Sequence, residues 1–361
     1  MSLAYRSLAE LGWDDRFESD FSPHRARDLE PGRVIRSIRA TYSLTTERGP
    51  VTGRVSGAFR RDAGEVDLPA VGDWVALEAE GQDAAAIRAI LPRRSYIRRK
   101  VAGERTREQV IAANLDFVFI VSSLNSELRP RRIERYLTSA YDSGATPVVV
   151  LTKADLHYDP EQAVAEVAAI APGTPVHAVN CLTEEGASLL RGYFDDNRTV
   201  ALIGSSGVGK STLVNTLAGS TVLVTRDIRE DDKGRHTTTH RELVSLPRGG
   251  HVIDTPGMRE LQLWDGSVEE AFADVEELAA SCRFSDCRHD REPGCAVQAA
   301  VEAGTLAPSR LESYRKLERE LRFVRAKQNA RSRAEERKRD KHIGKANRQR
   351  MKLEQTRDRN R

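Results

Sequence analysis

Long apolar runs are absent from this sequence. The first residues, MSLAYRSLAELGWDD, lack a basic start followed by an apolar stretch, and no segment approaches the roughly 20 apolar residues of a membrane span. We therefore expect neither a secretory leader nor a membrane partner. The expectation is a soluble, cytoplasmic protein.

Cysteine is also scarce, because four cysteines in 361 residues are too few for a disulfide-built scaffold. Three of them lie close together, and Cys282, Cys287, His289 and Cys295 form a C-x4-C-x-H-x5-C pattern. Three thiolates and one imidazole make a closed tetrahedral ligand set, which suits a structural Zn²⁺ and leaves no open position for catalysis. The pattern predicts one zinc ion per chain, with Cys181 as a free thiol.

A strong overall charge is lacking too, since the net charge is only +3. The charge is uneven, however: residues 325–361 hold 15 Lys/Arg against 5 Asp/Glu. This basic tail has almost no large apolar residues, so we expect it to be disordered without a partner. It is either a solvated arm or a phosphate-seeking arm for nucleic acid.

Between residues 33 and 93 the chain alternates apolar and polar side chains in short runs that are broken by Gly and Pro. This pattern predicts a small antiparallel β-barrel of the OB type. Such a barrel either binds RNA or serves as a packing module for its neighbour. A basic connector of Arg93, Arg94, Arg98, Arg99 and Lys100 follows it.

From residue 115 onward, short and continuously apolar runs alternate with helical stretches. We predict strands at 115–121, 147–151, 175–179, 199–204 and 251–254, and helices near 130–143, 160–170, 185–194 and 210–218. Strands that are apolar on both faces and joined by helices indicate a mainly parallel, doubly wound α/β sheet. Strand signals stop near residue 265, after which helices are expected at 267–282 and 308–324.

The segment ALIGSSGVGKST matches the phosphate-binding P-loop, placed after an apolar strand and before a helix. Glycines let the backbone N–H groups point at phosphates, Lys210 adds charge near the β and γ phosphates, and the Ser211 hydroxyl can bind Mg²⁺. The predicted phosphate site comprises Gly204, Ser205, Ser206, Gly207, Val208, Gly209, Lys210, Ser211 and Thr212.

Two downstream segments complete a nucleotide triphosphate site. In HVIDTPG, Asp254 ends a strand and is placed to hold Mg²⁺ through water, and the Gly257 N–H can sense the γ-phosphate. In GRHTTTH, residues 234–240, Thr238 is a candidate switch hydroxyl for Mg²⁺, the alternative being an ordinary polar loop.

The stretch LTKADL predicts a guanine-reading loop made of Thr152, Lys153, Ala154 and Asp155. It closes the strand 147–151 at the carboxyl edge, where α/β sheets bind ligands. Asp155 would accept hydrogen bonds from the guanine ring N–H and exocyclic amine, which adenine cannot supply, so ATP is the less suited nucleotide. Residues 179–183, VNCLT, take the place of the loop over the guanine edge.

The motifs run in an unusual order, with the base reader before the P-loop. Conventional GTPases begin with the P-loop, whereas a parallel sheet tolerates new termini if strand neighbours are kept. The barrel, the segment 109–116 (QVIAANLD), the rotated motifs, GRHTTT and the Cys/His cluster together resemble the circularly permuted GTPases of the RsgA (YjeQ/YloQ) family.

The resemblance implies a multidomain α/β protein. Its expected parts are an N-terminal extension (1–32), an OB-type β-barrel (33–93), a circularly permuted P-loop GTPase domain (105–263), a helical zinc-binding domain (264–324) and a basic tail (325–361). It also implies a monomeric GTP hydrolase that uses Mg²⁺, binds the 30S ribosomal subunit and its 16S rRNA, and acts in late maturation of that subunit.

The pattern lacks one catalytic group that Ras-like GTPases carry. Met258 stands where Ras-like enzymes carry the water-orienting glutamine, so slow intrinsic turnover is expected. His236 is the candidate substitute, alongside Lys210 and Asp254, unless it is simply a solvent-facing loop histidine. The alternative function is an RNA-binding assembly checkpoint that senses GTP and GDP with little hydrolysis.

Overall fold

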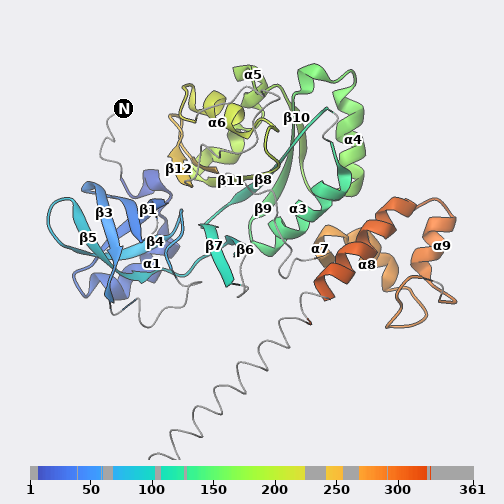
Figure 1. Cartoon of the computed structure of the whole chain (residues 1–361), viewed down its shortest axis with the longest axis horizontal. Coiled ribbons are helices and arrows are strands. Elements are labelled where there is room, and N and C mark those ends of the chain that lie inside the picture. The colour runs from blue at the N-terminus through green and yellow to red at the C-terminus, as the bar shows by residue number, and fades with distance from the viewer. Residues whose placement is uncertain are drawn as a thin grey trace, which may run out of the picture.

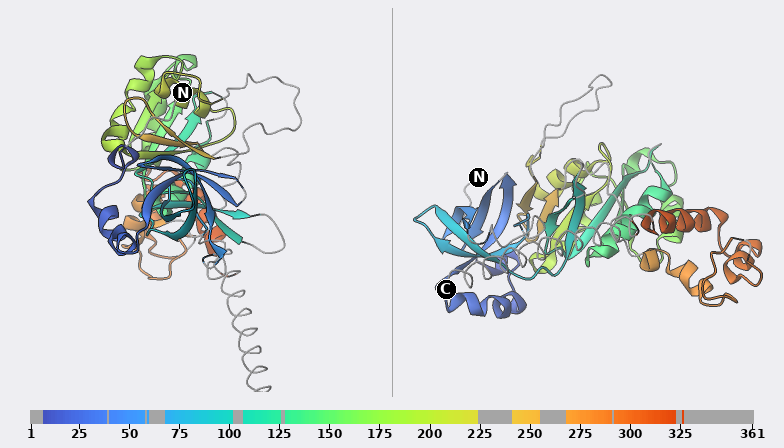
Figure 2. Two further views of the ribbon diagram at one scale, coloured as in Figure 1. Left: turned by 90° about the vertical axis from the view of Figure 1, so that its left-hand side faces the viewer. Right: turned by 60° about the horizontal axis from the view of Figure 1, so that its bottom comes forward.

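The computed structural model arranges the chain as three units in a row (Figures 1 and 2). It describes residues 7–38, 40–57, 59, 68–101, 107–125, 128–223, 241–254, 268–290, 292–322 and 326. A β-barrel stands at one end, an α/β domain in the middle and a group of helices at the other end. In the part of the chain that the structure describes, no helix is both long and apolar enough to cross a bilayer.

Five strands close the N-terminal barrel. They are β1 (Glu30–Ile38), β2 (Thr41–Thr46), β3 (Gly49–Val55), β4 (Trp74–Ala79) and β5 (Ala84–Ile90). They pair in the cyclic order β1-β2-β3-β5-β4-β1, and alternate side chains, among them Val34, Leu44 and Ile87, fill the interior. The expectation of a wholly antiparallel barrel is wrong in one place, because β3 and β5 pair in parallel.

The segment before the barrel is folded, although the sequence pattern gave no structure for it. A short 3₁₀ turn, η1 (Ala9–Leu11), precedes helix α1 (Asp15–Arg25), whose first N–H groups are capped by the Asp14 carboxylate. The Trp13 ring packs edge-on against the buried Trp74 of β4 at 4.7 Å between centroids. Helix α1 thus covers one end of the barrel (Figure 1).

The basic connector forms a two-stranded hairpin of β6 (Tyr96–Val101) and β7 (Arg107–Ala113), which the sequence analysis did not predict. Among its arginines, Arg93 and Arg94 form ion pairs with the barrel and with the cap of α1. Arg93 binds the buried Asp73 carboxylate at 2.7 Å, and Arg94 forms an ion pair with Asp14. These two cations therefore hold the barrel and α1 in place.

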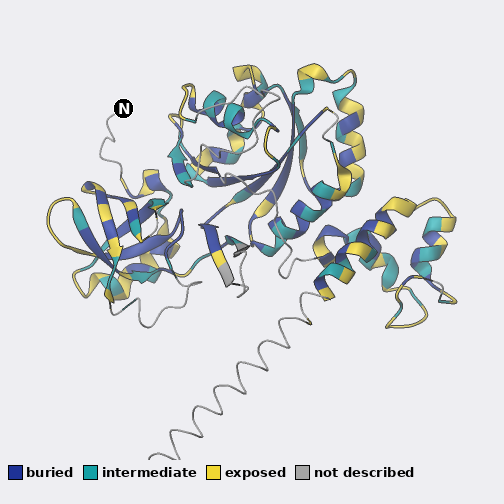
Figure 3. Ribbon diagram, in the orientation of Figure 1, coloured by how far each residue is buried: buried dark blue, intermediate teal, exposed yellow. Residues whose placement is uncertain are grey.

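The central sheet has the order β10-β9-β8-β11-β13-β12. Its strands are β8 (Phe117–Ser123), β9 (Thr146–Thr152), β10 (Val176–Val179), β11 (Thr199–Ile203), β12 (Glu242–Ser245) and β13 (His251–Asp254). Five of the strands are parallel, and only β12, which no sequence pattern predicted, is antiparallel. Figure 3 shows these strands as the most deeply buried part of the domain.

Helices cover both faces of this sheet. They are α3 (Pro130–Asp142), α4 (Pro160–Ile170), α5 (Glu184–Ser188), η4 (Arg191–Asn197) and α6 (Lys210–Ala218). Along β8, Val118 and Ile120 pack towards α3 and α4, while Phe119 and Val121 pack towards α5 and α6. The helix expected at 185–194 is instead a short α-helix followed by a 3₁₀ segment, with Asp195 and Asp196 outside helical geometry.

The barrel and the central sheet are joined through β1, which pairs with β12 at Arg36 and Glu242. Close to this junction the Arg33 guanidinium is fully buried, and it donates to the Leu11 carbonyl and to the Thr199 hydroxyl at 2.7 Å. Burial lowers its pKa to about 10. One side chain therefore ties the N-terminal turn, the barrel and β11 together.

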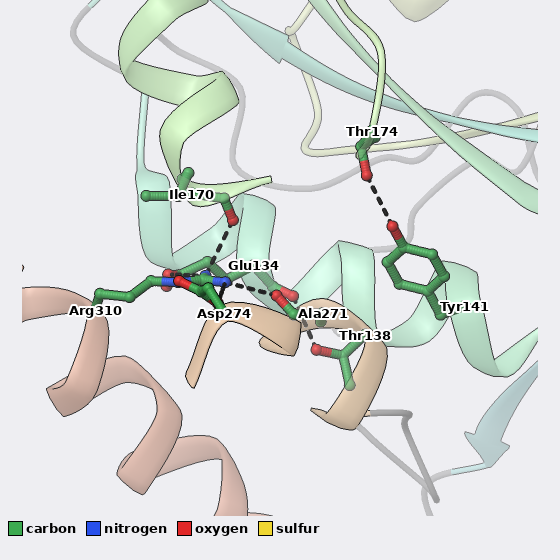
Figure 4. A network of polar contacts seen from close by, with 8 residues as sticks. All are labelled: Glu134, Thr138, Tyr141, Ile170, Thr174, Ala271, Asp274 and Arg310. Carbon is green, nitrogen blue, oxygen red and sulfur yellow. Dashed lines mark hydrogen bonds and ion pairs between the residues drawn. The ribbon is translucent and has the colours of Figure 1, made fainter. Parts of the chain in front are cut away.

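The C-terminal unit contains α7 (Val268–Ala271), α8 (Ala273–Ala279), α9 (Ala296–Glu302) and a helix at 308–322. Its contact with the central domain centres on Arg310 (Figure 4). All five N–H donors of this guanidinium are used: they reach the carboxylates of Glu134 and Asp274 and the carbonyls of Ile170 and Ala271 at 2.7–3.0 Å.

Replacing Arg310 with Ala should destabilise the chain by about 3–5 kcal/mol, because Glu134 would remain buried without its partner. Burial already raises the Glu134 pKa, and loss of the guanidinium raises it further. The folded state then takes up a proton, so the deficit should be largest near neutral pH and shrink as pH falls. Denaturant unfolding as a function of pH measures it.

The matched control is Arg131→Ala, which removes an exposed ion pair with Glu312 from the same helix pair. It should cost less than about 1 kcal/mol. Equal losses for the two variants would show that the buried network does not fix this interface.

Candidate functional site

The P-loop geometry begins with a glycine that no other residue can replace. Gly204 follows β11 with φ of +151°, and a Cβ there would lie 2.2 Å from the Val121 carbonyl oxygen of the neighbouring strand. Gly209, with φ of +94°, ends the loop, and α6 starts at Lys210. The loop therefore turns from a buried strand end directly into a helix N-terminus, the arrangement that suits phosphate.

Lys210 folds back over this loop. Its ammonium group donates to the carbonyls of Gly204 at 2.9 Å and Ser205 at 2.7 Å. Burial lowers its pKa, while the charge of Asp254 acts in the opposite direction. The P-loop lysine and the carboxylate at the end of β13 are thus electrostatic neighbours, with Ser211 in the first turn of α6.

The segment 152–155, which the sequence predicts to read the base, is joined to the P-loop by Thr152. Its fully buried hydroxyl lies 2.5 Å from the Val208 carbonyl and 3.3 Å from the Ser122 carbonyl. The next residue, Lys153, adopts a left-handed conformation with φ of +59°, which is unusual for a side chain of this size. A 3₁₀ turn at Ala154–Leu156 then presents the exposed Asp155.

The loop after β10 lies beside Asp155. Burial, together with the negative charge of Asp155, raises the pKa of the Cys181 thiol to about 12, so this cysteine stays protonated at neutral pH. The Thr216 hydroxyl of α6 donates to the Cys181 carbonyl at 2.6 Å. Three segments therefore meet at the carboxyl edge of the sheet: residues 152–155, residues 179–183 and helix α6.

Three candidate residues, His236, Thr238 and Gly257, lie outside the described residues, as does Met258. Their roles stay predictions from the sequence. Asp254 is the last described residue before Gly257 and Met258, and it is 7% exposed at the end of β13.

The Cys/His cluster assembles in the C-terminal unit, where the ligand atoms of Cys282, Cys287, His289 and Cys295 all lie within 4.8 Å of one another. The Cys282 and Cys295 sulfurs are 3.9 Å apart, and each lies 3.5–3.6 Å from His289 Nδ1. A tetrahedral zinc with Zn–S bonds of about 2.3 Å separates two sulfurs by about 3.8 Å. The donor set and its spacing therefore fit a zinc ion.

Comparisons with known proteins bear on this geometry. A family model described as RsgA GTPase matches residues 90–264. A small ribosomal subunit biogenesis GTPase RsgA 1 of Oceanobacillus iheyensis is 48% identical over 317 residues, which cover 86% of this chain and 90% of the relative. The chain belongs to the RsgA family of GTPases.

A further relative agrees with this assignment, and a second family model overlaps part of the same region. RsgA of Streptomyces coelicolor is 44% identical over 346 residues, 94% of this chain and 93% of its own. A model described as ABC transporter also matches residues 190–359, a range that includes the P-loop, which both classes of nucleotide hydrolase use.

Two solved structures resemble the fold. YjeQ from Thermotoga maritima has a TM-score of 0.61 at 29% identity and covers 81% of this chain and 98% of its own. YloQ, described as a circularly permuted GTPase, has a TM-score of 0.59 at 26% identity, with coverage of 82% and 96%. The predicted fold class, a barrel followed by a circularly permuted GTPase domain and a Cys/His-bearing helical unit, is confirmed.

One polar contact of the P-loop was missed in the sequence. Arg132, in the first turn of α3, donates to the Ser205 hydroxyl at 2.8 Å. Its only signal was a run of arginines, RPRR at 129–132, just past the apolar strand at 115–121. Nothing in that run tells which arginine faces the P-loop.

Changing Thr152 to Val should weaken GTP and GDP alike by about 5- to 30-fold, because a buried hydrogen bond between the two loops is worth about 1–2 kcal/mol. Thr152→Ser, which keeps the hydroxyl, should bind as the parent does. Fluorescent-nucleotide titration measures both. A Val variant that binds normally, or that changes only base preference, would contradict a role in fixing the loops.

Proposed function

We propose that this RsgA-family chain hydrolyses GTP during biogenesis of the small ribosomal subunit and that the subunit stimulates the reaction. The observation that carries the GTPase part is the convergence of Lys210, Asp254 and the Thr152 bridge at one sheet edge. The ribosomal part is supported by the relatives named small ribosomal subunit biogenesis GTPase, which are 44–48% identical over most of the chain.

In this proposal the triphosphate lies along residues 204–212. The loop N–H groups bind the phosphate oxygens, and Lys210 leaves the Gly204 and Ser205 carbonyls to contact the β and γ phosphates. The Ser211 hydroxyl and Asp254 would hold Mg²⁺, which neutralises charge that develops on the phosphates.

Guanine would lie between residues 152–155 and 179–183. Asp155 accepts from the ring N–H and the exocyclic amine, and the Lys153 stem lies against the base plane. The role of Thr152 is one of position, because its hydroxyl is directed to the Val208 carbonyl and is fully buried.

We further propose roles for the residues beyond Asp254 and in the switch loop, on the basis of the sequence pattern. The Gly257 N–H would sense the γ-phosphate, Thr238 would approach Mg²⁺, and His236 would orient the attacking water. Met258 offers no polar atom for that last task.

The remaining proposals concern the modules around the GTPase domain. We propose that zinc fills the Cys/His cluster, that the tail 325–361 and the barrel contact 16S rRNA, and that the chain acts as a cytoplasmic monomer. We also propose the domain boundaries expected from the sequence: the barrel at 33–93, the GTPase domain at 105–263 and the helical domain at 264–324. Because α7 starts at Val268, GTP binding near Asp254 is well placed to move the zinc-binding helices against the barrel.

The rate of GTP hydrolysis should rise at least about tenfold when purified small subunits are added. A partner that orders the switch segments would hold the catalytic groups and the attacking water in position. Phosphate release from GTP, with ATP as the comparison substrate, measures it. Unchanged hydrolysis alongside intact GTP binding would favour the checkpoint function, and equal use of ATP would contradict the role of Asp155.

The purified chain should contain one zinc ion, and Cys282→Ser should lose it and speed hydrogen exchange across residues 282–302. Cys181→Ser is the matched control, because that thiol lies at the nucleotide site and outside the cluster. Metal analysis with hydrogen exchange checks both. Full zinc content in the Cys282 variant would exclude that sulfur as a ligand.

A further inference from the structure

The first turn of α3 is strongly basic, and its Arg132 contacts the phosphate loop. Arg129, Arg131 and Arg132 lie at this end, and the turn contains no acidic residue. The N-terminus of a helix carries partial positive charge, so cations there reduce stability unless an anion is nearby. An anion bound beside Arg132 would offset this cost.

The arginines of this helix face different neighbours. Arg131 and Arg135 form ion pairs with Glu312 and Glu320 of the C-terminal helix at 2.6 Å. Arg132 places its guanidinium 2.8 Å from the Ser205 hydroxyl. Arg132 thus contacts the P-loop directly.

Ser205 also marks which part of the triphosphate lies nearby. Its carbonyl accepts from the Lys210 ammonium at 2.7 Å, and a P-loop lysine reaches the β and γ phosphates. Two cationic side chains therefore meet at one residue of the loop. Arg132 is half-buried, so a phosphate at this place would be partly shielded from water.

We propose that Arg132 is a catalytic arginine supplied by this chain itself, which contacts the γ-phosphate during hydrolysis. The inference rests on the proposed GTPase function. The Ser205 hydroxyl holds the guanidinium beside the loop, and bound GTP draws it onto a γ-phosphate oxygen. The role is separate from the water-orienting role assigned to His236.

In the reaction the water oxygen forms a bond to the γ-phosphorus while the bond to the β–γ bridging oxygen breaks. The electron pair of the broken bond stays on the β-phosphate of GDP, and the proton of the water ends on inorganic phosphate. In the transition state, negative charge is spread over the phosphoryl oxygens. The planar guanidinium fork of Arg132 stabilises this charge.

The test uses the full-length chain with small subunits. Arg132→Ala should lower the single-turnover hydrolysis rate by about 100-fold or more, while GDP affinity stays within about threefold. It should also fail to bind GDP with aluminium fluoride, which mimics the transferring phosphoryl group. Arg132→Lys, which keeps the charge and loses the fork, should fall between Ala and the parent.

Arg131→Ala is the matched control, since it removes the adjacent arginine whose partner is Glu312, and it should hydrolyse GTP as the parent does. If Arg132→Ala hydrolyses at the parental rate, or loses GDP and GTP affinity equally without a change in rate at saturation, the proposal is wrong and the contact only supports the loop. If the parent itself hydrolyses no GTP with subunits, the proposed function fails first and this inference fails with it.

Discussion

The burial of Arg310 is the constraint on which the C-terminal half of the molecule depends. A guanidinium removed from water must satisfy its five donors, and here two carboxylates and two backbone carbonyls do so from four different elements (Figure 4). The Phe272 ring, 4.0 Å from the guanidinium carbon, closes the site. Such a network is directional, so it sets how the helices that carry the Cys/His cluster sit on α3.

Helix α3 consequently belongs to two sites. Glu134 holds the Arg310 network, and Arg132, two residues earlier, lies against Ser205 of the P-loop. The other flank of the nucleotide site has a similar link, because β12 pairs with both β13 and the barrel strand β1. The predicted phosphate loop therefore lies between contacts to both outer modules, and a change there would have a short route to each.

The sequence predicted those features whose cause is local. The five parallel strands of the central sheet were predicted because both of their faces are apolar. The P-loop and the Cys/His cluster were predicted because residue spacing alone defines them. The antiparallel β12 and the packing of Trp13 on Trp74 depend on partners far along the chain, so no short pattern revealed them. The same holds for the contact of Thr152, because its Val208 partner lies 56 residues away.

The circular permutation gives this arrangement a physical purpose. In the sheet, β11 and β13 are neighbours, as a phosphate site requires, yet the chain leaves β13 for α7 instead of continuing through the domain. Only 13 residues separate Asp254 from Val268, and α7 packs beside the buried Arg310. A displacement after Asp254 would therefore reach the helices that carry the Cys/His cluster through a short covalent path. In the conventional motif order, the same strand would be followed by the base-reading half of the domain, and that path would be lost.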